Sequence, residues 1–179
     1  MFVQIENTPN PNSLKFLPGK TVSNNGSFEI TKKDETNNDL IKNLLSINGI
    51  EGIFLGKDFI SINKYDEISW DEIKHIIISL INDFYSSGKE CVIEKGLVED
   101  SEDLKEIEKK IVEILDKKIR PAVAKDGGDI KFKEFKNGVV KVQLQGSCSG
   151  CPSSTMTLKQ GVQNLLCHYL PEVKSVEAI

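Results

Sequence analysis

The sequence predicts an α+β protein built from two small domains, and three observations carry this prediction. The chain has 179 residues, a length between one average domain and two small ones. Segments with the period-2 alternation of strands are mixed with segments of helical periodicity on both sides of residues 89–100. That stretch is rich in acidic residues and has the composition of a solvated linker. We therefore expect one domain at residues 1–88 and a second at residues 101–179.

The composition excludes several functional classes. Hydrophobic residues make up 39% of the chain and charged residues 28%, which is typical of a globular protein. A net charge of −4 argues against a general nucleic-acid binder, and apolar runs such as Ile76–Ile78 are far shorter than the ~20 residues of a membrane span. Met1 directly precedes the first expected strand, with no leader-like segment. We expect a bacterial cytoplasmic protein, with a mitochondrial matrix protein after leader removal as the alternative.

In the first domain, short alternating segments and one clear helical stripe predict the order of elements. In order they are strand 2–6, strand 14–17, helix 38–47, strand 49–55, strand 59–62 and a helix that begins after Ser69. Gly56-Lys57-Asp58 predicts a hairpin between the last two strands. Ser69, with Glu72 three residues later, has the pattern of a capping box.

In the second domain the expected order is α-β-β-α-β. Ser101 is the expected N-cap of a first helix that stops at Arg120-Pro121, because proline disrupts a helix interior. Asp126-Gly127-Gly128-Asp129 predicts a turn, and Asn137-Gly138 predicts a hairpin. The remaining expected elements are strand 130–135, strand 139–144, a helix to about Leu170 and strand 173–176.

The segment Cys148-Ser149-Gly150-Cys151 carries the clearest chemical signal. With no export signal, the four cysteines of the chain indicate ligating or reactive thiols rather than disulfides. A C-x-x-C loop lets two sulfurs converge on one metal atom or on neighbouring atoms of a cluster. Pro152 fits the first position of the next helix, whose amides at residues 153–155 and positive dipole end favour a thiolate. We therefore expect both sulfurs to be partly exposed and readily deprotonated.

Three kinds of chemistry compete for this loop on the residues alone. A thioredoxin-like redox pair also begins a helix, although the hairpin–loop–helix order lacks the βαβ context expected for it. A structural zinc site needs four ligands, and Cys167 lies roughly 24 Å beyond Cys151 along a straight helix at ~1.5 Å per residue. Two loops from two chains would supply the four thiolates that a tetrahedral zinc ion or a [4Fe–4S] cluster requires.

Longer stretches of the chain resemble a known family. The run from Arg120 to Ile130, with its Asp-Gly-Gly-Asp turn, and the run from Gly146 to Leu158 resemble the C-terminal NifU domain. The run from Thr8 to Phe16 resembles the N-terminal domain of Nfu proteins. The two resemblances fall on the two expected domains in the family's order.

The resemblance implies an iron–sulfur cluster scaffold or carrier. Cys148 and Cys151 would bind cluster iron, and two protomers would share one [4Fe–4S] cluster as a homodimer. The resemblance also implies delivery to apo client proteins and contact with upstream cluster assembly proteins. We expect a carrier rather than an enzyme, because the sequence shows no constellation of nucleophile and base.

The other candidate residues have structural interpretations. The turn at residues 126–129 is expected only to redirect the chain, and His75 is expected on the solvated face of its helix. Cys91 is expected to be an incidental, oxidisable thiol in the linker, and Cys167 an exposed or packing residue. The prolines and asparagines of residues 8–16 predict a shaped loop, for which a role in docking clients or assembly proteins is expected.

Overall fold

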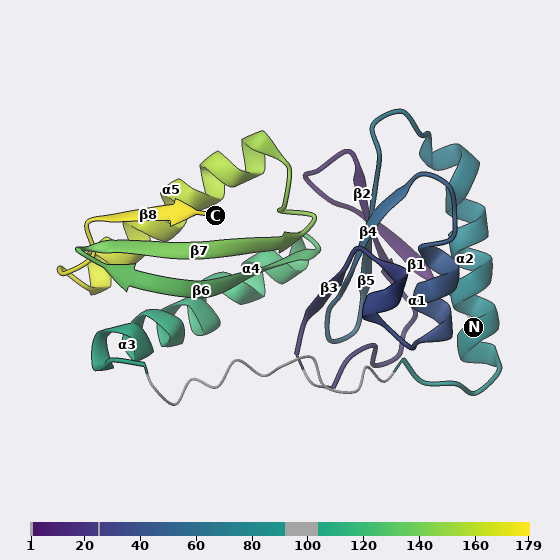
Figure 1. The fold of residues 1–179 in the computed structure, drawn as a ribbon, viewed down its shortest axis with the longest axis horizontal. Helices are drawn as coiled ribbons and strands as arrows, with labels where there is room; N and C mark the ends of the chain where they lie inside the picture. Colours follow the sequence, from purple (N-terminus) through teal and green to yellow (C-terminus); the bar gives the residue numbers. More distant parts are fainter. Residues whose placement is uncertain (1, 25, 92–103) are drawn as a thin grey trace.

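The computed structural model describes residues 2–24, 26–91 and 104–179, which form two α+β units (Figure 1). Most of the acidic stretch and the expected N-cap Ser101 fall outside the described residues. The α+β class is confirmed, because each unit packs helices against a sheet with antiparallel strands. Within the described part of the chain, no helix is long and apolar enough to cross a membrane.

The first unit is a five-stranded antiparallel sheet with two helices on one face (Figure 1). Along the sheet the strands lie in the order β1-β2-β5-β4-β3. Their bounds are β1 Gln4–Asn7, β2 Ser13–Leu17, β3 Phe28–Ile30, β4 Ile50–Leu55 and β5 Ile60–Lys64. The helices are α1 Asp39–Leu44 and α2 Trp70–Ser86, and a short 3-10 turn at Lys33–Glu35 follows β3.

Helix α2 forms where its apolar residues recur on one face and a serine caps its first turn. Ile73, Ile77 and Ile81 are buried on that face against the sheet. The Ser69 hydroxyl accepts a hydrogen bond from the Asp71 amide at 3.3 Å, which confirms the expected N-cap. In the described structure no reciprocal bond from a glutamate completes the expected capping box.

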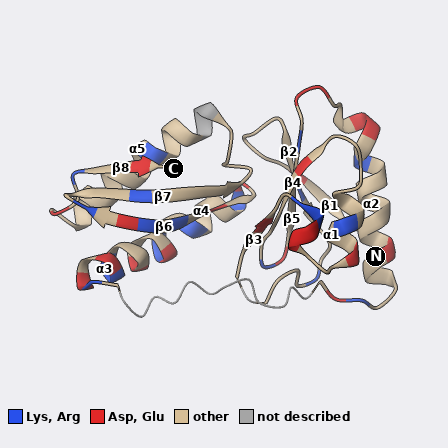
Figure 2. Ribbon diagram, in the orientation of Figure 1, with Lys and Arg blue, Asp and Glu red and all other residues tan. Residues whose placement is uncertain are grey.

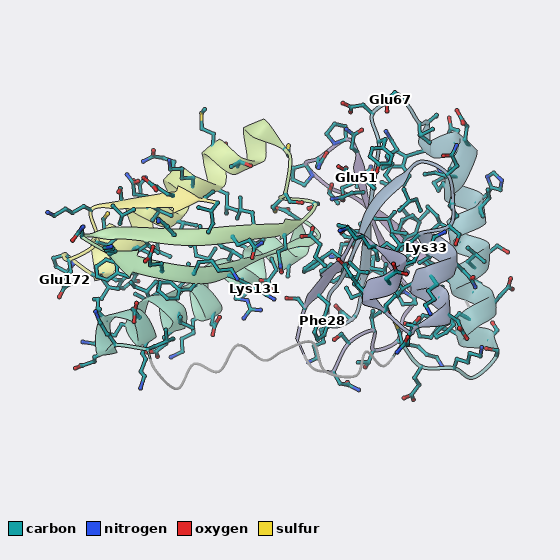
Figure 3. All side chains as sticks on the ribbon, in the orientation of Figure 1. Phe28, Lys33, Glu51, Glu67, Lys131 and Glu172 are labelled. Atoms are coloured by element: carbon teal, nitrogen blue, oxygen red, sulfur yellow. The ribbon has the colours of Figure 1, made fainter. Side chains whose placement is uncertain are left out.

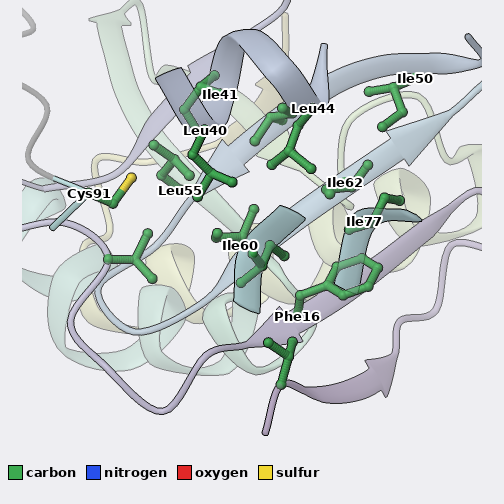
Figure 4. Close-up of a cluster of buried hydrophobic side chains, with 14 of the residues drawn as sticks. Phe16, Leu40, Ile41, Leu44, Ile50, Leu55, Ile60, Ile62, Ile77 and Cys91 are labelled. Atoms are coloured by element: carbon green, nitrogen blue, oxygen red, sulfur yellow. The ribbon is translucent and has the colours of Figure 1, made fainter. Parts of the chain in front are cut away.

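Strand alternation gives the sheet of the first unit two chemically different faces. Residues such as Phe16, Ile53 and Ile62 point toward α1 and α2 and build the hydrophobic core (Figure 4). Lys15 precedes Phe16 in β2, and Ser61 precedes Ile62 in β5, so their side chains point to the other face of the sheet. There the two residues lie opposite one another. The helices lie on the side away from the second unit, so this other face is turned toward it (Figure 1).

The second unit has a three-stranded sheet in the order β6-β7-β8, in which β7 and β8 are parallel. The turn residues Asn137 and Gly138 have φ values of 54° and 80°, left-handed conformations that asparagine and glycine adopt most readily, and the predicted hairpin is confirmed. Apolar residues of the three helices share one core with this sheet. The elements are α3 Glu106–Ile114, α4 Arg120–Lys125, β6 Gly128–Lys136, β7 Val139–Gly146, α5 Pro152–Tyr169 and β8 Ser175–Ala178.

Charges of both signs alternate along the outer face of the first helical stretch of this unit (Figure 2). Lys110 pairs with Glu106 and Lys117 pairs with Glu113, in each case one helical turn apart. Exposed pairs of this kind contribute little to stability, so this face is a solvated surface rather than a structural ion-pair network.

The expected helix stop at Arg120-Pro121 is wrong. A π-helical segment, Leu115–Ile119, precedes α4, and the Arg120 amide bonds to the Leu115 carbonyl five residues back. The wider turn places Pro121 at the second residue of a new α-helix, where the missing N–H costs little. The chain therefore stays helical from Glu106 to Lys125.

Strand β3 was not expected from the sequence. It is three residues long and pairs antiparallel with β4 at the sheet edge, where Ile30 lies opposite Ile53. A strand this short is defined by its partner rather than by its own pattern. The final strand also differs, since it lies at Ser175–Ala178 rather than at 173–176.

Candidate metal centre

The paired cysteines lie where β7 ends and α5 begins, as expected. Cys148 follows the end of β7 at Gly146, and Cys151 is the N-cap residue of α5. Ser149 closes the turn, because its amide and hydroxyl donate to the Gly146 carbonyl at 3.1 and 2.8 Å. Pro152 takes the first position of α5, which confirms that part of the sequence interpretation.

One of the amides expected to be free and to point back toward the loop is bonded to the loop backbone. The Thr155 amide donates to the Cys151 carbonyl at 2.9 Å, and the Thr155 hydroxyl donates to the same oxygen at 2.8 Å. This amide points toward the loop, as expected, but it is not free, because it closes the first turn of α5.

Both cysteines are buried in this structure, whereas partial exposure was expected. Cys148 is 4% exposed and Cys151 is 6% exposed. Burial raises the pKa of the Cys148 thiol to about 11. The Ser147 hydroxyl opposes this rise in pKa, and the nearby carboxylate of Asp126 adds to it. The expectation of a readily deprotonated thiol is therefore wrong for Cys148 in this arrangement.

The turn between α4 and β6 forms the floor of the cysteine loop. The Ser147 amide donates to the Gly127 carbonyl at 3.2 Å, and the Ser147 hydroxyl donates to the Asp126 carbonyl. The turn redirects the chain, as expected, but these bonds also fix the residue that precedes Cys148. Sequence reasoning missed this second role because the contact joins residues far apart in the chain.

Gly128 makes room for the candidate ligand. A Cβ added to Gly128 would lie 2.8 Å from the Cys148 sulfur and 2.6 Å from the Gln145 carbonyl oxygen. Real Cβ atoms do not approach other atoms this closely, so the side chain of Cys148 can occupy its position only over a glycine. The two consecutive glycines of the turn were the available signal for such a close approach.

An arginine–aspartate pair braces the same turn. Arg120 donates from Nε and Nη2 to the two carboxylate oxygens of Asp129, each at 2.8 Å. The Asp129 side chain is 6% exposed, and it also accepts bonds from the Ile130 amide at 2.8 Å and from the Ser27 hydroxyl. A buried carboxylate with four donors holds the start of β6 in place beside the cysteine loop.

The first unit reaches the cysteine loop through the proline–asparagine segment. The Asn10 side-chain amide donates to the Ser147 carbonyl at 3.0 Å. Pro9 and Cys148 line the same cavity of about 630 Å³, which α4 and α5 complete through residues such as Val123 and Leu158. Sequence reasoning expected this segment to dock other proteins, whereas in this structure it contacts the chain's own second unit.

The other expected candidates lie apart from the loop. Cys91 is 3% exposed and belongs to the hydrophobic core of the first unit, beside residues such as Leu40 and Leu55, so its assignment as an incidental linker thiol is wrong (Figure 4). Cys167 is half-buried against the core of the second unit, and His75 is exposed, as expected. Among residues 2–24, 26–91 and 104–179, no group of three or more His, Cys, Asp or Glu side chains is placed to hold a metal ion.

An α+β protein that presents two thiols at one strand–helix loop belongs to the class of C-x-x-C proteins that bind metals or exchange disulfides. Comparisons with known proteins show the family to which the chain belongs. The family model "NifU-like domain" matches residues 111–177, and the model "Scaffold protein Nfu/NifU N terminal" matches residues 3–88.

Curated relatives extend this match to the whole chain. The human "NFU1 iron-sulfur cluster scaffold homolog, mitochondrial" is 43% identical over 100% of this chain and 72% of its own length. "NifU-like protein 4, mitochondrial" of Arabidopsis thaliana is 44% identical over 99% of this chain and 65% of its own length. The chain therefore belongs to the NifU-like/Nfu family of iron–sulfur cluster scaffold proteins, and the resemblance stated from the sequence is confirmed.

The chain spans 65% of the length of the Arabidopsis relative and 72% of the human one. Their names carry the word "mitochondrial", which gives no support to the expectation of a cytoplasmic protein. Among solved structures, a NifU-like protein from Saccharomyces cerevisiae matches with a TM-score of 0.45 and 31% identity, over 53% of this chain and 87% of that one. A protein of Staphylococcus aureus matches with a TM-score of 0.42 and 27% identity, over 45% of this chain and 98% of that one.

Proposed function

We propose that this scaffold protein holds an iron–sulfur cluster as its cargo through Cys148 and Cys151 and passes the cluster to other proteins. One observation supports the proposal most strongly. In a chain of this family, the two cysteines lie at one strand–helix loop, separated by two residues and backed by a glycine that makes room for the first sulfur. Thiolate is the ligand that iron–sulfur clusters use most.

The number of ligands favours a cluster shared between two chains. One loop supplies two thiolates, whereas a [4Fe–4S] cluster takes four cysteine ligands. Two protomers that bring their loops together would complete this set, so we propose a cluster-bridged homodimer. A cluster held at such an interface lies near solvent, where incoming client thiolates can replace the protein ligands one at a time.

The residues around the loop determine how readily the thiols could lose their protons and bind iron. Each cysteine must lose a proton to bind iron, and the buried position of Cys148 opposes this loss. Loading therefore requires the loop to become more accessible than it is here. Arg120 and Asp129 fix the turn below the loop, so the loop can open without losing its floor.

The remaining parts of the proposal follow from the family. We propose a carrier rather than an enzyme, with apo iron–sulfur proteins as clients and cluster assembly proteins upstream. The division into residues 1–88, a linker at 89–100 and residues 101–179 is proposed with it, supported by the two family models at residues 3–88 and 111–177, except that the core of the first unit extends to Cys91. The mitochondrial matrix is the proposed compartment, supported by the names of the relatives.

Cluster transfer tests the carrier proposal. The protein is loaded with iron and sulfide, freed of unbound iron, and mixed with an apo iron–sulfur enzyme in the presence of a chelator. We expect recovery of the client's activity with wild type and with Cys167→Ala, and none with Cys148→Ala or Cys151→Ala. A client that stays inactive with the loaded wild type contradicts delivery.

Two other functions remain open for a C-x-x-C loop and have different signatures. Disulfide exchange by a monomer would indicate an oxidoreductase. A colourless dimer that a chelator dissociates would indicate a zinc-bridged interaction module. Neither signature is expected from the family, whose named members are iron–sulfur cluster scaffolds.

A further inference from the structure

The polar face of the first unit's sheet is built against the cysteine loop and the turn below it. Side chains of both units meet in the space between the two sheets (Figure 3), and β4 and β5 contact β7. The residues of this face that touch the second unit come from three strands, from the β3 edge and from the proline–asparagine segment. Six of them form what we call the docking face: Asn10, Lys15, Glu29, Phe54, Ser61 and Asn63.

Three side chains of the docking face bond to Gly146, Ser147 or Ser149, the residues around Cys148. Asn10 donates to the Ser147 carbonyl at 3.0 Å, and Asn63 donates to the Gly146 carbonyl at 3.1 Å. Glu29 accepts from the Gly146 amide at 3.1 Å and from the Ser149 hydroxyl at 3.4 Å. The backbone just before Cys148 and the Ser149 side chain just after it are therefore held by the first unit.

The other three members fit the backbone of the glycine turns. Lys15 donates to the Lys125 carbonyl at 3.4 Å. A Cβ on Gly127 would lie 2.4 Å from the Ser61 hydroxyl, and a Cβ on Gly146 would lie 2.9 Å from the Phe54 ring. The two units approach each other this closely because both turns carry glycine at the contact.

The proline–asparagine segment is shaped for its part in this contact. The Thr8 hydroxyl accepts from the Asn10 amide at 3.2 Å and donates to the Asn10 carbonyl at 2.9 Å. The Asn10 side-chain oxygen accepts from the Asn12 amide at 2.9 Å, which leaves its NH₂ group to face Ser147. The most distinctive motif of the first unit thus presents one amide to the residue before Cys148.

The chemistry of the docking face suits a contact that opens. Five of its six side chains are polar or charged, so the face tolerates water when the units separate. When the docking face contacts the second unit, the Ser61 hydroxyl and the Asn63 side-chain oxygen are buried with no hydrogen-bond partner among the described residues. Contacts between domains of one chain are commonly polar and reversible.

We propose that the docking face is an intramolecular binding surface for the C-x-x-C loop, and that it competes with the second protomer for this loop. The inference rests on the proposed function, because it says that the docking face must separate from the loop before two loops can share a cluster. In the closed chain the docking face bonds to Gly146, Ser147 and Ser149, and Pro9 lines the cavity beside Cys148. Separation of the units frees the loop for the partner.

Two isosteric substitutions in the full chain test the contact. Asn10→Asp and Asn63→Asp replace each NH₂ donor by a carboxylate oxygen that repels the carbonyl it faces, while the acceptor that Asn12 uses is kept. The matched control changes two exposed asparagines of the same unit, Asn37→Asp and Asn48→Asp, with the same change in charge. Thermal unfolding followed by circular dichroism verifies that each variant is folded.

Two readouts are compared across the three proteins. Hydrogen exchange of apo protein measures protection of residues 145–151, and cluster-dependent dimerisation measures access to the loop. In the docking variant we expect exchange of that segment to rise and the protein concentration for half-dimerisation to fall, each by about tenfold, because a larger fraction is open. Wild type and control are expected to agree.

Other outcomes overturn the inference in distinguishable ways. Unchanged exchange in the docking variant shows that the contact is not populated in solution. Faster exchange with unchanged dimerisation shows that the contact does not compete with the partner, and weaker dimerisation shows that the first unit supports the loop. If wild type also takes up no cluster, both the proposed function and the proposed competition with the partner protomer fail. The hydrogen-exchange data then still decide whether the two units dock.

Discussion

Gly128 and Cys148 are in contact across the floor of the candidate site: a Cβ on the glycine would come within 2.8 Å of the cysteine sulfur. The position of the first candidate ligand is thus set by a missing side chain in a turn twenty residues earlier in the chain. The same Cβ would lie 2.6 Å from the Gln145 carbonyl, a backbone atom that cannot rotate away. This pair makes the turn part of the site rather than a mere connection.

Replacement of Gly128 by alanine is expected to displace the cysteine loop and to lower cluster binding. The methyl group clashes with a sulfur and with backbone, so the loop must shift, and the overpacking destabilises the second unit by about 1–3 kcal/mol. Iron content after reconstitution and the unfolding midpoint measure both effects. Gly161→Ala is the control, since nothing lies within 4 Å of its Cβ. Equal iron content in the two variants would contradict the role of Gly128.

Arg120→Lys is expected to destabilise the second unit by about 1–2 kcal/mol, because lysine cannot make the two-point bond to Asp129. The loss stays below that of a fully buried pair because the Arg120 side chain is 38% exposed. Denaturant unfolding measures the change. Lys117→Ala, which breaks only the exposed pair with Glu113, is expected to show no measurable change. A wild-type midpoint for Arg120→Lys would show that the pair does not brace the turn.

The apo protein is expected to alkylate slowly at Cys148 at neutral pH. Burial holds the pKa of this thiol at about 11, so the reactive thiolate becomes abundant only as the pH approaches that value. Mass spectrometry after brief iodoacetamide treatment, from pH 7 to pH 11, gives the rate for each cysteine separately. Half-maximal labelling of Cys148 near pH 7 would mean that the resting loop already carries a thiolate.

Cys91 is expected to make the first unit less stable at alkaline pH. Its pKa is raised by burial from an ordinary value of 9.0 to about 11, so the folded state holds the proton more tightly than the unfolded state. The stabilisation is complete below pH 9 and is lost as the pH rises toward 11, by about 1–3 kcal/mol. Unfolding midpoints of wild type and Cys91→Ala at pH 8 and pH 10.5 isolate this contribution. Equal pH dependence in the two proteins contradicts it.

Local signals in the sequence predicted the elements that depend on neighbouring residues. Asn137-Gly138 specifies its own turn, and Ser69 with the apolar stripe Ile73–Ile81 specifies α2. Features that depend on distant partners or on irregular backbone escaped prediction. Strand β3 exists only through its pairing with β4, and Pro121 is tolerated only because a π-helical segment precedes it.

The features of the candidate site also divide into local ones that the sequence predicted and long-range ones that it did not. The spacing of Cys148 and Cys151 and the start of α5 at Pro152 are local and could be read from the sequence. The burial of Cys148 depends on Gly128 and on the hydrophobic core of the second unit, and no pattern within the loop reports it. Cys91 was misassigned for a related reason, since the chain returns to the core of the first unit after α2 has ended at Ser86.

Anaerobic reconstitution with iron and sulfide tests the central claim most directly, with iron, sulfide, visible spectrum and mass measured on the same samples. Wild type is compared with Cys148→Ala and Cys151→Ala, and with Cys91→Ala and Cys167→Ala as matched controls. We predict a brown dimer with about four irons and four sulfides per two chains, lost in the first pair of variants and kept in the second. A colourless monomer that cycles a disulfide, or a cluster that survives both loop substitutions, would contradict the account.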